Sequence, residues 1–197
     1  PAPTIIAGRP PVEAQPRPAH IVALAAAAPA QAAEVKIGVL LGYTGPIESL
    51  TPGMADSAEL AMTEINEAGG IMGDTLVPVR ADSTCVDASA ASAAAERLVA
   101  SEGVKAIMGA DCSGVTIATL NNVALPQGVV MVSPSATSPA LTTIEDQGLF
   151  FRTAPSDARQ GAVLAEILSG KGVEEIAVTY TNNDYGKGLA DSFQAAF

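Results

Sequence analysis

A chain of 197 residues that is 48% hydrophobic can bury one large core or two small ones, and with only 4% aromatic residues that core must be built from Ala, Val, Ile, Leu and Met. The formal net charge of -11 is a poor match for nucleic acid or an anionic membrane surface, because both repel a carboxylate-rich body. The balance suits a soluble protein of an extracytoplasmic space, with no nucleic-acid partner.

Residues 1–33 differ in composition from the rest of the chain. They are rich in Pro and carry basic residues ahead of a short apolar run at 20–28, which is followed by Ala30 and Ala32 in an A-x-A arrangement. This order predicts a secretory signal peptide that is cleaved near Ala32 or Ala33. The apolar run is too short for a spanning helix. The alternative is an Ala-rich linker or a short buried helix.

From Glu34 onward, short β-rich runs alternate with helical stretches. We expect strands at residues 35–41, 76–82, 104–109, 129–132 and 175–180, with a brief extended piece at 150–152. We expect helices at about residues 54–68, 87–101, 113–126, 157–169 and from 184 onward, with a short helix or turn at 138–143. Such alternation, with strands buried on both faces, predicts a doubly wound parallel α/β sheet. The last strand and helix begin a second sheet without completing it, so we expect a C-terminal truncation.

Three local features refine this prediction. The first helix repeats apolar residues at helical spacing, and these should face inward: Ala58, Ala61, Met62, Ile65 and Ala68. Asp87 is a good N-cap for the second helix. Pro78 in the second strand indicates an edge position or the start of the strand, because Pro cannot donate to a ladder.

The chain has two cysteines, Cys85 and Cys112. In an exported chain, two cysteines more often form a disulfide than remain free thiols. Such a bridge would contribute roughly 3–4 kcal/mol in the chain-entropy model. Two thiols are too few for structural zinc, so we expect neither a metal nor another cofactor. The only His, His20, lies in the predicted signal segment, which removes Ser-His-Asp and Cys-His catalytic arrangements from the mature chain.

The loops that follow the strands are the candidate sites, because ligands of open α/β sheets bind beyond the carboxyl ends of the strands. These loops are rich in Ser, Thr and Gly, and two of them open helices, where hydroxyls and backbone N–H groups gather at a positive dipole end. That arrangement suits a carboxylate. The simpler interpretation of Ser113 and Ser138, each taken alone, is that they cap helices. No nucleotide motif and no paired acid and base are present, so we do not expect an enzyme.

Seven segments in order, with matching spacing, carry a resemblance to a known family. They are KIGV with TGP (36–46), AELA with EINEAGGI (58–71), DSTC (82–85), GADCS (109–113), SPSATSPALT (133–142), FRTAPSD (151–157) and NDYGKG (183–188). The stretch 34–197 thereby resembles the periplasmic leucine/isoleucine/valine-binding proteins, which are type I solute-binding proteins of ABC importers.

The resemblance implies two α/β lobes that are joined by a hinge and close on a ligand. Residues 34–152 would form the N-terminal lobe, and residues 153–197 the hinge crossing and the start of an incomplete second lobe. The pair Cys85 and Cys112 matches the family's lobe-one disulfide. The implied function is that of a periplasmic monomer that delivers a branched-chain or other amino acid, or an amide or aromatic acid, to an ABC transporter permease. The alternative is a ligand-sensing domain of a receptor or regulator with the same fold.

Three site residues carry over from the family to the first lobe. The Ser113 hydroxyl would donate to the ligand carboxylate, and the Ser135 carbonyl would accept from the ligand ammonium. Thr137 would use its hydroxyl and its amide on the two ends of the same ligand backbone.

Four further positions are implied at the margins of the site. Tyr185 would cover the ligand from the opposite side, and Asp157, just past the hinge, could help to neutralise the ammonium. Leu50 stands where an aromatic ring often lies against the ligand. Asp111 stands where leucine-type binders place an apolar residue, and an acidic group there would disfavour a purely aliphatic ligand side chain.

Overall fold

The computed structural model describes residues 32–197. Residues 1–31 of the predicted signal peptide therefore lie outside the described residues. Its strands are β1 Glu34–Leu41, β2 Thr75–Asp82, β3 Ala106–Gly109, β4 Val130–Ser133 and β5 Phe150–Arg152. Its helices are α1 Thr51–Glu67, α2 Ala88–Glu96, α3 Ser113–Thr119, α4 Leu125–Gln127, α5 Ala140–Thr143, α6 Asp157–Gly170 and α7 Asp184–Ala196. Two π-helical turns, η1 Arg97–Ser101 and η2 Leu120–Ala124, continue α2 and α3.

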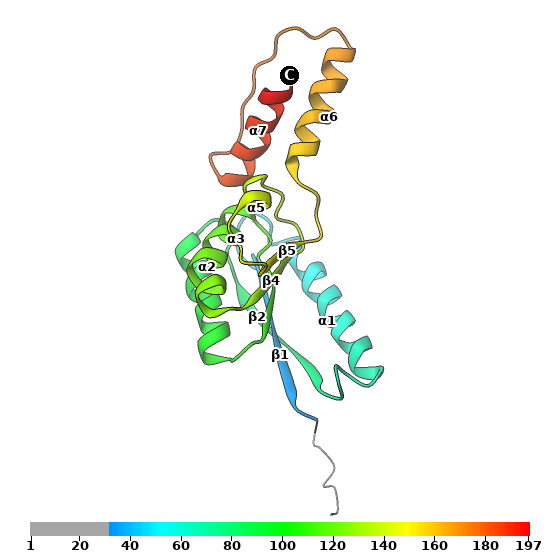
Figure 1. The fold of residues 1–197 in the computed structure, drawn as a ribbon, viewed down its shortest axis with the longest axis vertical. Coiled ribbons are helices and arrows are strands. Elements are labelled where there is room, and N and C mark those ends of the chain that lie inside the picture. The colour runs from blue at the N-terminus through cyan, green and yellow to red at the C-terminus, as the bar shows by residue number, and fades with distance from the viewer. Residues whose placement is uncertain (1–31) are drawn as a thin grey trace, which may run out of the picture. The chain divides into compact units, whose positions relative to one another are not determined.

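The five strands form one sheet in the order β2-β1-β3-β4-β5, and every neighbouring pair is parallel. Helix α1 covers one face of this sheet, and α2 and α3 cover the other (Figure 1). The predicted parallel α/β sheet is thus confirmed. Pro78 lies on the edge strand β2, as predicted, where its missing N–H interrupts no ladder on the open side.

The core divides at the sheet because successive side chains of a strand point to opposite faces. Leu40 of β1 joins the larger cluster under α2 and α3, whereas Val39 and Leu41 join the smaller cluster under α1. Gly38 lets the larger cluster pack closely, since a Cβ at this position would lie 3.0 Å from Leu98 Cδ1. The Ala-rich face of α2 serves the same close approach.

Of the five residues predicted to face inward on α1, Met62 is buried and Ala58 is half-buried, and the prediction is wrong for the other three. The helix begins at Thr51 and buries Thr51, Ala55 and Met62, while Ala61 and Ala68 are exposed and Ile65 is 38% exposed. Alanine tolerates both environments, so the apolar pattern did not define the face. Arg80 of β2 also holds the charged side of the helix close to the sheet, because it forms ion pairs with carboxylates of α1 at 2.8 and 2.5 Å.

The predicted strand at residues 175–180 is extended backbone without a ladder partner among the described residues. It lies in the connection between α6 and α7, which pack against each other (Figure 1). A β-rich sequence becomes a strand only when a neighbouring strand satisfies its N–H and C=O groups, and this part of the structure offers none. None of the helices within residues 32–197 combines the length and apolarity that a bilayer span needs.

Candidate ligand-binding site

The parallel sheet brings the loops after β1, β2, β3 and β4 to one edge, and Asp111 ties them together. This residue is only 3% exposed. Its Oδ2 accepts from the Gly42 amide at 2.8 Å, and its Oδ1 accepts from the Ser83 hydroxyl at 3.1 Å and the Cys112 amide at 3.0 Å. Its backbone carbonyl accepts from the Ser135 hydroxyl at 2.8 Å. Both carboxylate oxygens are therefore engaged by protein donors.

A disulfide reinforces the same edge. Cys85 and Cys112 are bridged, with their Cα atoms 5.2 Å apart, so the predicted disulfide is present. The bridge joins the loop after β2 to the residue before α3. Thr84 and Cys85 both have positive φ, at 58° and 69°, a conformation that non-Gly residues rarely adopt. The bridge and the neighbouring hydrogen bonds hold this tight turn.

Ser113 is the first residue of α3 and does not cap it. The N-cap is Cys112, which makes no side-chain cap bond, so the capping interpretation of Ser113 is wrong. Ser113 is 2% exposed, and its Oγ accepts from the Ser138 amide at 3.1 Å. Among the hydrogen bonds within residues 32–197 this hydroxyl donates to no acceptor, so its proton is available. Ser138 lies before Pro139, the N-cap of α5, and its Oγ accepts from Ala140 N at 3.4 Å.

Thr137 and Asp157 connect the loop after β4 to the start of α6. The Thr137 hydroxyl donates to Asp157 Oδ2 at 2.8 Å, and the Asp157 amide donates to the Thr137 carbonyl at 2.9 Å. Asp157 is 3% exposed and lies in the first turn of α6, where the helix dipole favours a carboxylate. Ser156 caps that helix by accepting from Ala158 N. The chain therefore enters α6 from a point that is hydrogen-bonded to the candidate site.

Tyr185 and Leu50 lie at the margins of this edge, 45% and 58% exposed respectively. Leu50 is the N-cap residue of α1, and Tyr185 lies in the first turn of α7. The start of α7 packs against the site, because a Cβ on Gly188 would lie 2.9 Å from Pro139 Cδ and 3.1 Å from Ser138 Oγ. The structure thus brings the loop residues of the sheet close together, whereas the side chains of Leu50 and Tyr185 remain exposed to solvent.

A second set of polar contacts fixes the loop after β1. The Thr44 hydroxyl donates to Asp82 Oδ2 at 2.6 Å, and the Thr84 amide donates to Asp82 Oδ1 at 2.8 Å. Burial alone would raise the pKa of Asp82, but hydrogen bonds from Thr44 and nearby amides outweigh it and lower that pKa below its ordinary value. Burial raises the pKa of Tyr43 to about 12, against the opposing charge of Arg80 above its ring. Sequence reasoning assigned no role to any of these residues.

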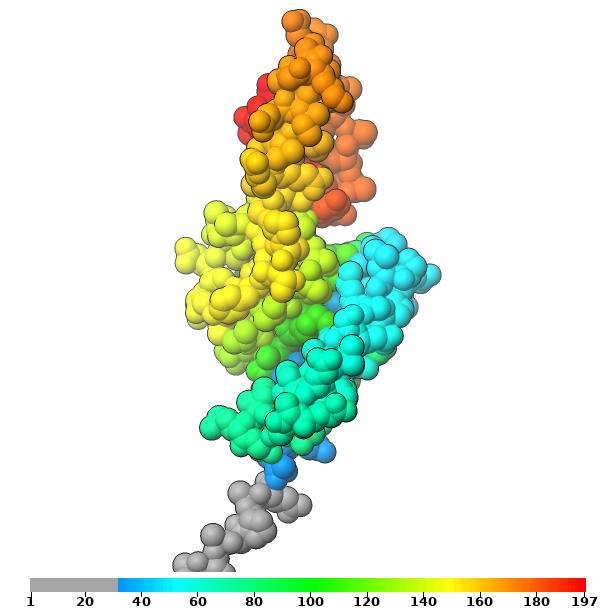
Figure 2. All heavy atoms as spheres, turned by 90° about the vertical axis from the view of Figure 1, so that its right-hand side faces the viewer, coloured from blue at the N-terminus to red at the C-terminus, as the bar shows by residue number. Residues whose placement is uncertain are grey.

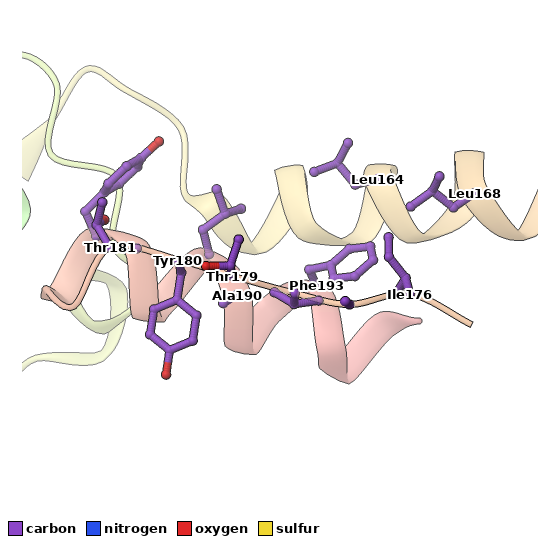
Figure 3. Close-up of a pocket in the computed structure, with 13 residues that line it drawn as sticks. Leu164, Leu168, Ile176, Thr179, Tyr180, Thr181, Ala190 and Phe193 are labelled. Carbon is purple, nitrogen blue, oxygen red and sulfur yellow. The ribbon is translucent and has the colours of Figure 1, made fainter. Parts of the chain in front are cut away.

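An apolar groove lies between α6 and α7, and its lining extends to Tyr185 at the start of α7. It has a volume of about 480 Å³. Figure 3 shows Leu164 and Leu168 of α6 on one side and Phe193 of α7 on the other, with Ile176 on the extended segment that runs beside them. Within residues 32–197, no group of three or more His, Cys, Asp or Glu side chains is arranged to hold a metal ion.

The parallel α/β sheet, with buried hydroxyls in its strand-end loops and a further helix pair after its last strand, has the fold of type I periplasmic binding proteins. The chain belongs to the periplasmic binding protein family, whose model matches residues 34–197.

Its relatives carry the names of binding proteins rather than enzymes. The Leu/Ile/Val-binding protein homolog 3 of Brucella melitensis is 37% identical over 167 residues, which are 83% of this chain and 44% of that protein. An ABC transporter substrate-binding protein from Desulfitobacterium hafniense, solved with Leu, is 35% identical with a TM-score of 0.68, over 83% of this chain and 47% of that one. LivJ from Streptococcus pneumoniae, solved with isoleucine, is 33% identical with a TM-score of 0.72 over the same shares. The chain therefore spans about half the length of the relatives it matches.

Proposed function

We propose that this chain captures a small amino-acid-like ligand at the carboxyl edge of its sheet, as the first lobe of a periplasmic solute-binding protein that delivers the ligand to an ABC importer. The observation that carries the proposal is the buried Ser113 hydroxyl. Within residues 32–197 it donates no hydrogen bond, and it lies beside the loop that holds Ser135 and Thr137. Relatives that are named for Leu, Ile and Val binding support the same ligand class.

Each hydroxyl has a role in this proposal. Ser113 donates to the ligand carboxylate, and the Ser135 carbonyl accepts from the ligand ammonium, while the Ser135 hydroxyl stays bonded to the Asp111 carbonyl. Thr137 contributes its hydroxyl and its amide. Because the Thr137 hydroxyl donates to Asp157 in the ligand-free chain, a ligand ammonium near Asp157 would release that hydroxyl for the ligand.

The margins of the site set the ligand's side chain. Tyr185 covers the ligand from α7, and Leu50 provides an aliphatic rather than an aromatic wall. Asp111 affects specificity chiefly through the loops that its carboxylate fixes, since both of its oxygens already accept from the protein. A buried carboxylate beside the proposed ligand site still disfavours a purely aliphatic ligand, which keeps polar amino acids, amides and aromatic acids among the candidates.

The domain proposal places the first lobe at residues 34–152 and the hinge crossing with the start of a second lobe at 153–197. Figure 2 supports it, because the yellow segment before α6 links the body of the molecule to the yellow-to-orange atoms of α6. The apolar groove of α6 and α7 could be covered by the strands of a second sheet. The greater length of the relatives also supports a second lobe. Residues 1–33 would be the export signal that precedes the lobe.

The test is a thermal-shift screen of the full-length protein against amino acids, amides, short peptides and aromatic acids. A ligand at one hundred times its dissociation constant should stabilise the native state by about 2.7 kcal/mol. Ser113→Ala should abolish that shift. It should also lower the ligand-free stability by about 1–3 kcal/mol, because the buried Ser138 amide loses its acceptor, so each shift is measured against the variant's own ligand-free melting temperature. Ser101→Ala, on an exposed turn far from the site, is the matched control.

The pattern of ligands decides between the alternatives. A shift with leucine, isoleucine or valine supports a branched-chain binder. A shift only with polar or aromatic solutes keeps the transport proposal and makes Leu50 and Asp111 the specificity determinants. A protein that responds to no ligand of the panel contradicts the proposal.

A further inference from the structure

Arg152, the last residue of β5, reaches back over the loop that carries Thr137. Its Nη1 donates to the Ala136 carbonyl at 3.3 Å and to the Ser138 carbonyl at 2.9 Å, and its Nη2 donates to the Thr142 hydroxyl at 2.5 Å. The two carbonyls flank Thr137 on either side. A guanidinium suits this task because it presents several donors in a rigid plane and stays charged at any working pH.

The contact with Ala136 orients the amide that the ligand would use. The carbonyl of Ala136 and the N–H of Thr137 belong to one planar trans peptide and point in opposite directions. Fixing the Ala136 carbonyl toward Arg152 therefore fixes the Thr137 N–H on the other side of the loop. The next peptide is fixed independently, because the Asp157 amide donates to the Thr137 carbonyl at 2.9 Å and the Ser138 amide donates to Ser113 Oγ at 3.1 Å.

The same arginine also joins this loop to the chain that leaves the sheet. Thr153, directly after Arg152, donates its amide to the Ser133 carbonyl at 3.1 Å and its hydroxyl to the Pro134 carbonyl at 3.2 Å. Arg152 and Thr153 thereby hold the loop 134–139 through the carbonyls of Pro134, Ala136 and Ser138.

We propose that Arg152 is a positioning residue that orients the Thr137 amide for the ligand and holds the loop 134–139 in register with the start of the crossing to α6. This inference rests on the proposed function. Arg152 does not touch the ligand itself in this proposal, and its effect on affinity passes through the Ala136–Thr137 peptide.

The test compares ligand affinity across matched variants of the full-length protein, with the best ligand of the thermal-shift panel and isothermal titration calorimetry. Arg152→Met should weaken binding about tenfold or more, because hydrogen bonds to a charged group are lost. Arg152→Lys, which keeps the charge but cannot reach both carbonyls and Thr142 together, should fall between Met and wild type. Thr142→Ala, which removes only the contact remote from Thr137, and Arg97→Met, on an exposed turn, should bind as wild type does.

A second readout separates positioning from general stability. Amide hydrogen exchange is followed by NMR in the ligand-free protein at Ala136 and Ser138, whose N–H groups donate to Ser133 Oγ and Ser113 Oγ on either side of Thr137. Exchange at these two amides should become faster in Arg152→Met, while amides of β1 and β3 keep their protection. Wild-type affinity in Arg152→Met would overturn the proposal. So would weaker binding with unchanged exchange at these two amides. If the wild-type protein binds nothing in the panel, the proposed function fails, and the exchange measurement alone decides whether Arg152 holds this loop. If Arg152→Met does not fold, the lysine variant carries both measurements.

Discussion

The sheet of residues 34–152 and the helix pair of residues 153–197 come from similar sequence patterns, yet they differ in how their apolar side chains are used. In the sheet, Val39, Leu40 and Leu41 are fully buried between helices. In the helix pair, Leu164 is 40% exposed and Ile176 is 44% exposed. An apolar pattern therefore specifies a strand or a buried face only where a neighbouring element is present to cover it.

The two regions also differ in how their loops are held. Hydrogen bonds between residues far apart in sequence, together with the disulfide, fix the loops of the sheet. The connection from 171 to 183 is held by local turns such as the bond from Gly172 N to the Ser169 carbonyl. A binding surface that must keep its geometry without ligand is therefore found on the first region.

The largest expected effect compares a buried leucine in one region with an exposed one in the other. Leu98→Ala should lower the free energy of unfolding by about 2–5 kcal/mol, since Leu98 is fully buried and a cavity would remain. Leu164→Ala, in the apolar groove, should cost less than about 1 kcal/mol in the 197-residue chain, because much of its surface is already in water. Urea unfolding measures both. Equal costs would mean that the groove is filled and that the comparison fails.

A smaller effect probes the contact that holds the helix pair together. A Cβ on Gly161 of α6 would lie 2.6 Å from the Phe193 amide nitrogen and 2.7 Å from the Ser192 carbonyl carbon of α7. Gly161→Ala should therefore force the helices apart at a cost of about 1–3 kcal/mol. Hydrogen exchange should report faster exchange in α7 and unchanged protection in β1.

Gly170→Ala is the matched control, because an added Cβ there has no heavy atom within 4 Å. If Gly161→Ala leaves the protection of α7 intact, the two helices do not depend on this close approach, and the helix pair is held by its side chains alone.

The parts of the fold that could be predicted depend on local chemistry. Asp87 accepts from the amides of Ser89 and Ala90 as an N-cap must, and Pro78 lies on an edge strand, because both effects are decided within a few residues. The disulfide followed from composition and compartment. The face of α1 could not be predicted, since Ala58 and Ala61 fit a core or a surface equally well, and the ion pairs of Arg80 with α1 are long-range.

The candidate site divides in the same way. Resemblance pointed to Ser113, Ser135 and Thr137, and these lie in the loops at one edge of the sheet. Most hydrogen bonds of Asp111 and Arg152 could not be read from the sequence, because they join segments that are separated by 10 residues or more along the chain. Asp111 stood out in the sequence only as a departure from the family's apolar residue, and Arg152 only because it lies inside a segment that resembles the family.

The smallest expected effect is a pH dependence that belongs to the sheet region alone. Because the pKa of Asp82 is lowered in the folded protein, its carboxylate stabilises the fold above its unfolded-state pKa of about 3.9, and that contribution is lost as the pH falls through the lower folded value. Asp82→Asn should cost about 1 kcal/mol at neutral pH, since a carboxylate acceptor for Thr44 and Thr84 is lost. The difference between wild type and variant in urea unfolding should shrink below about pH 4. Thr44→Val should reproduce part of the loss, whereas a difference that stays constant from pH 7 to about pH 2.5 would show that the Asp82 charge does not hold the loop after β1.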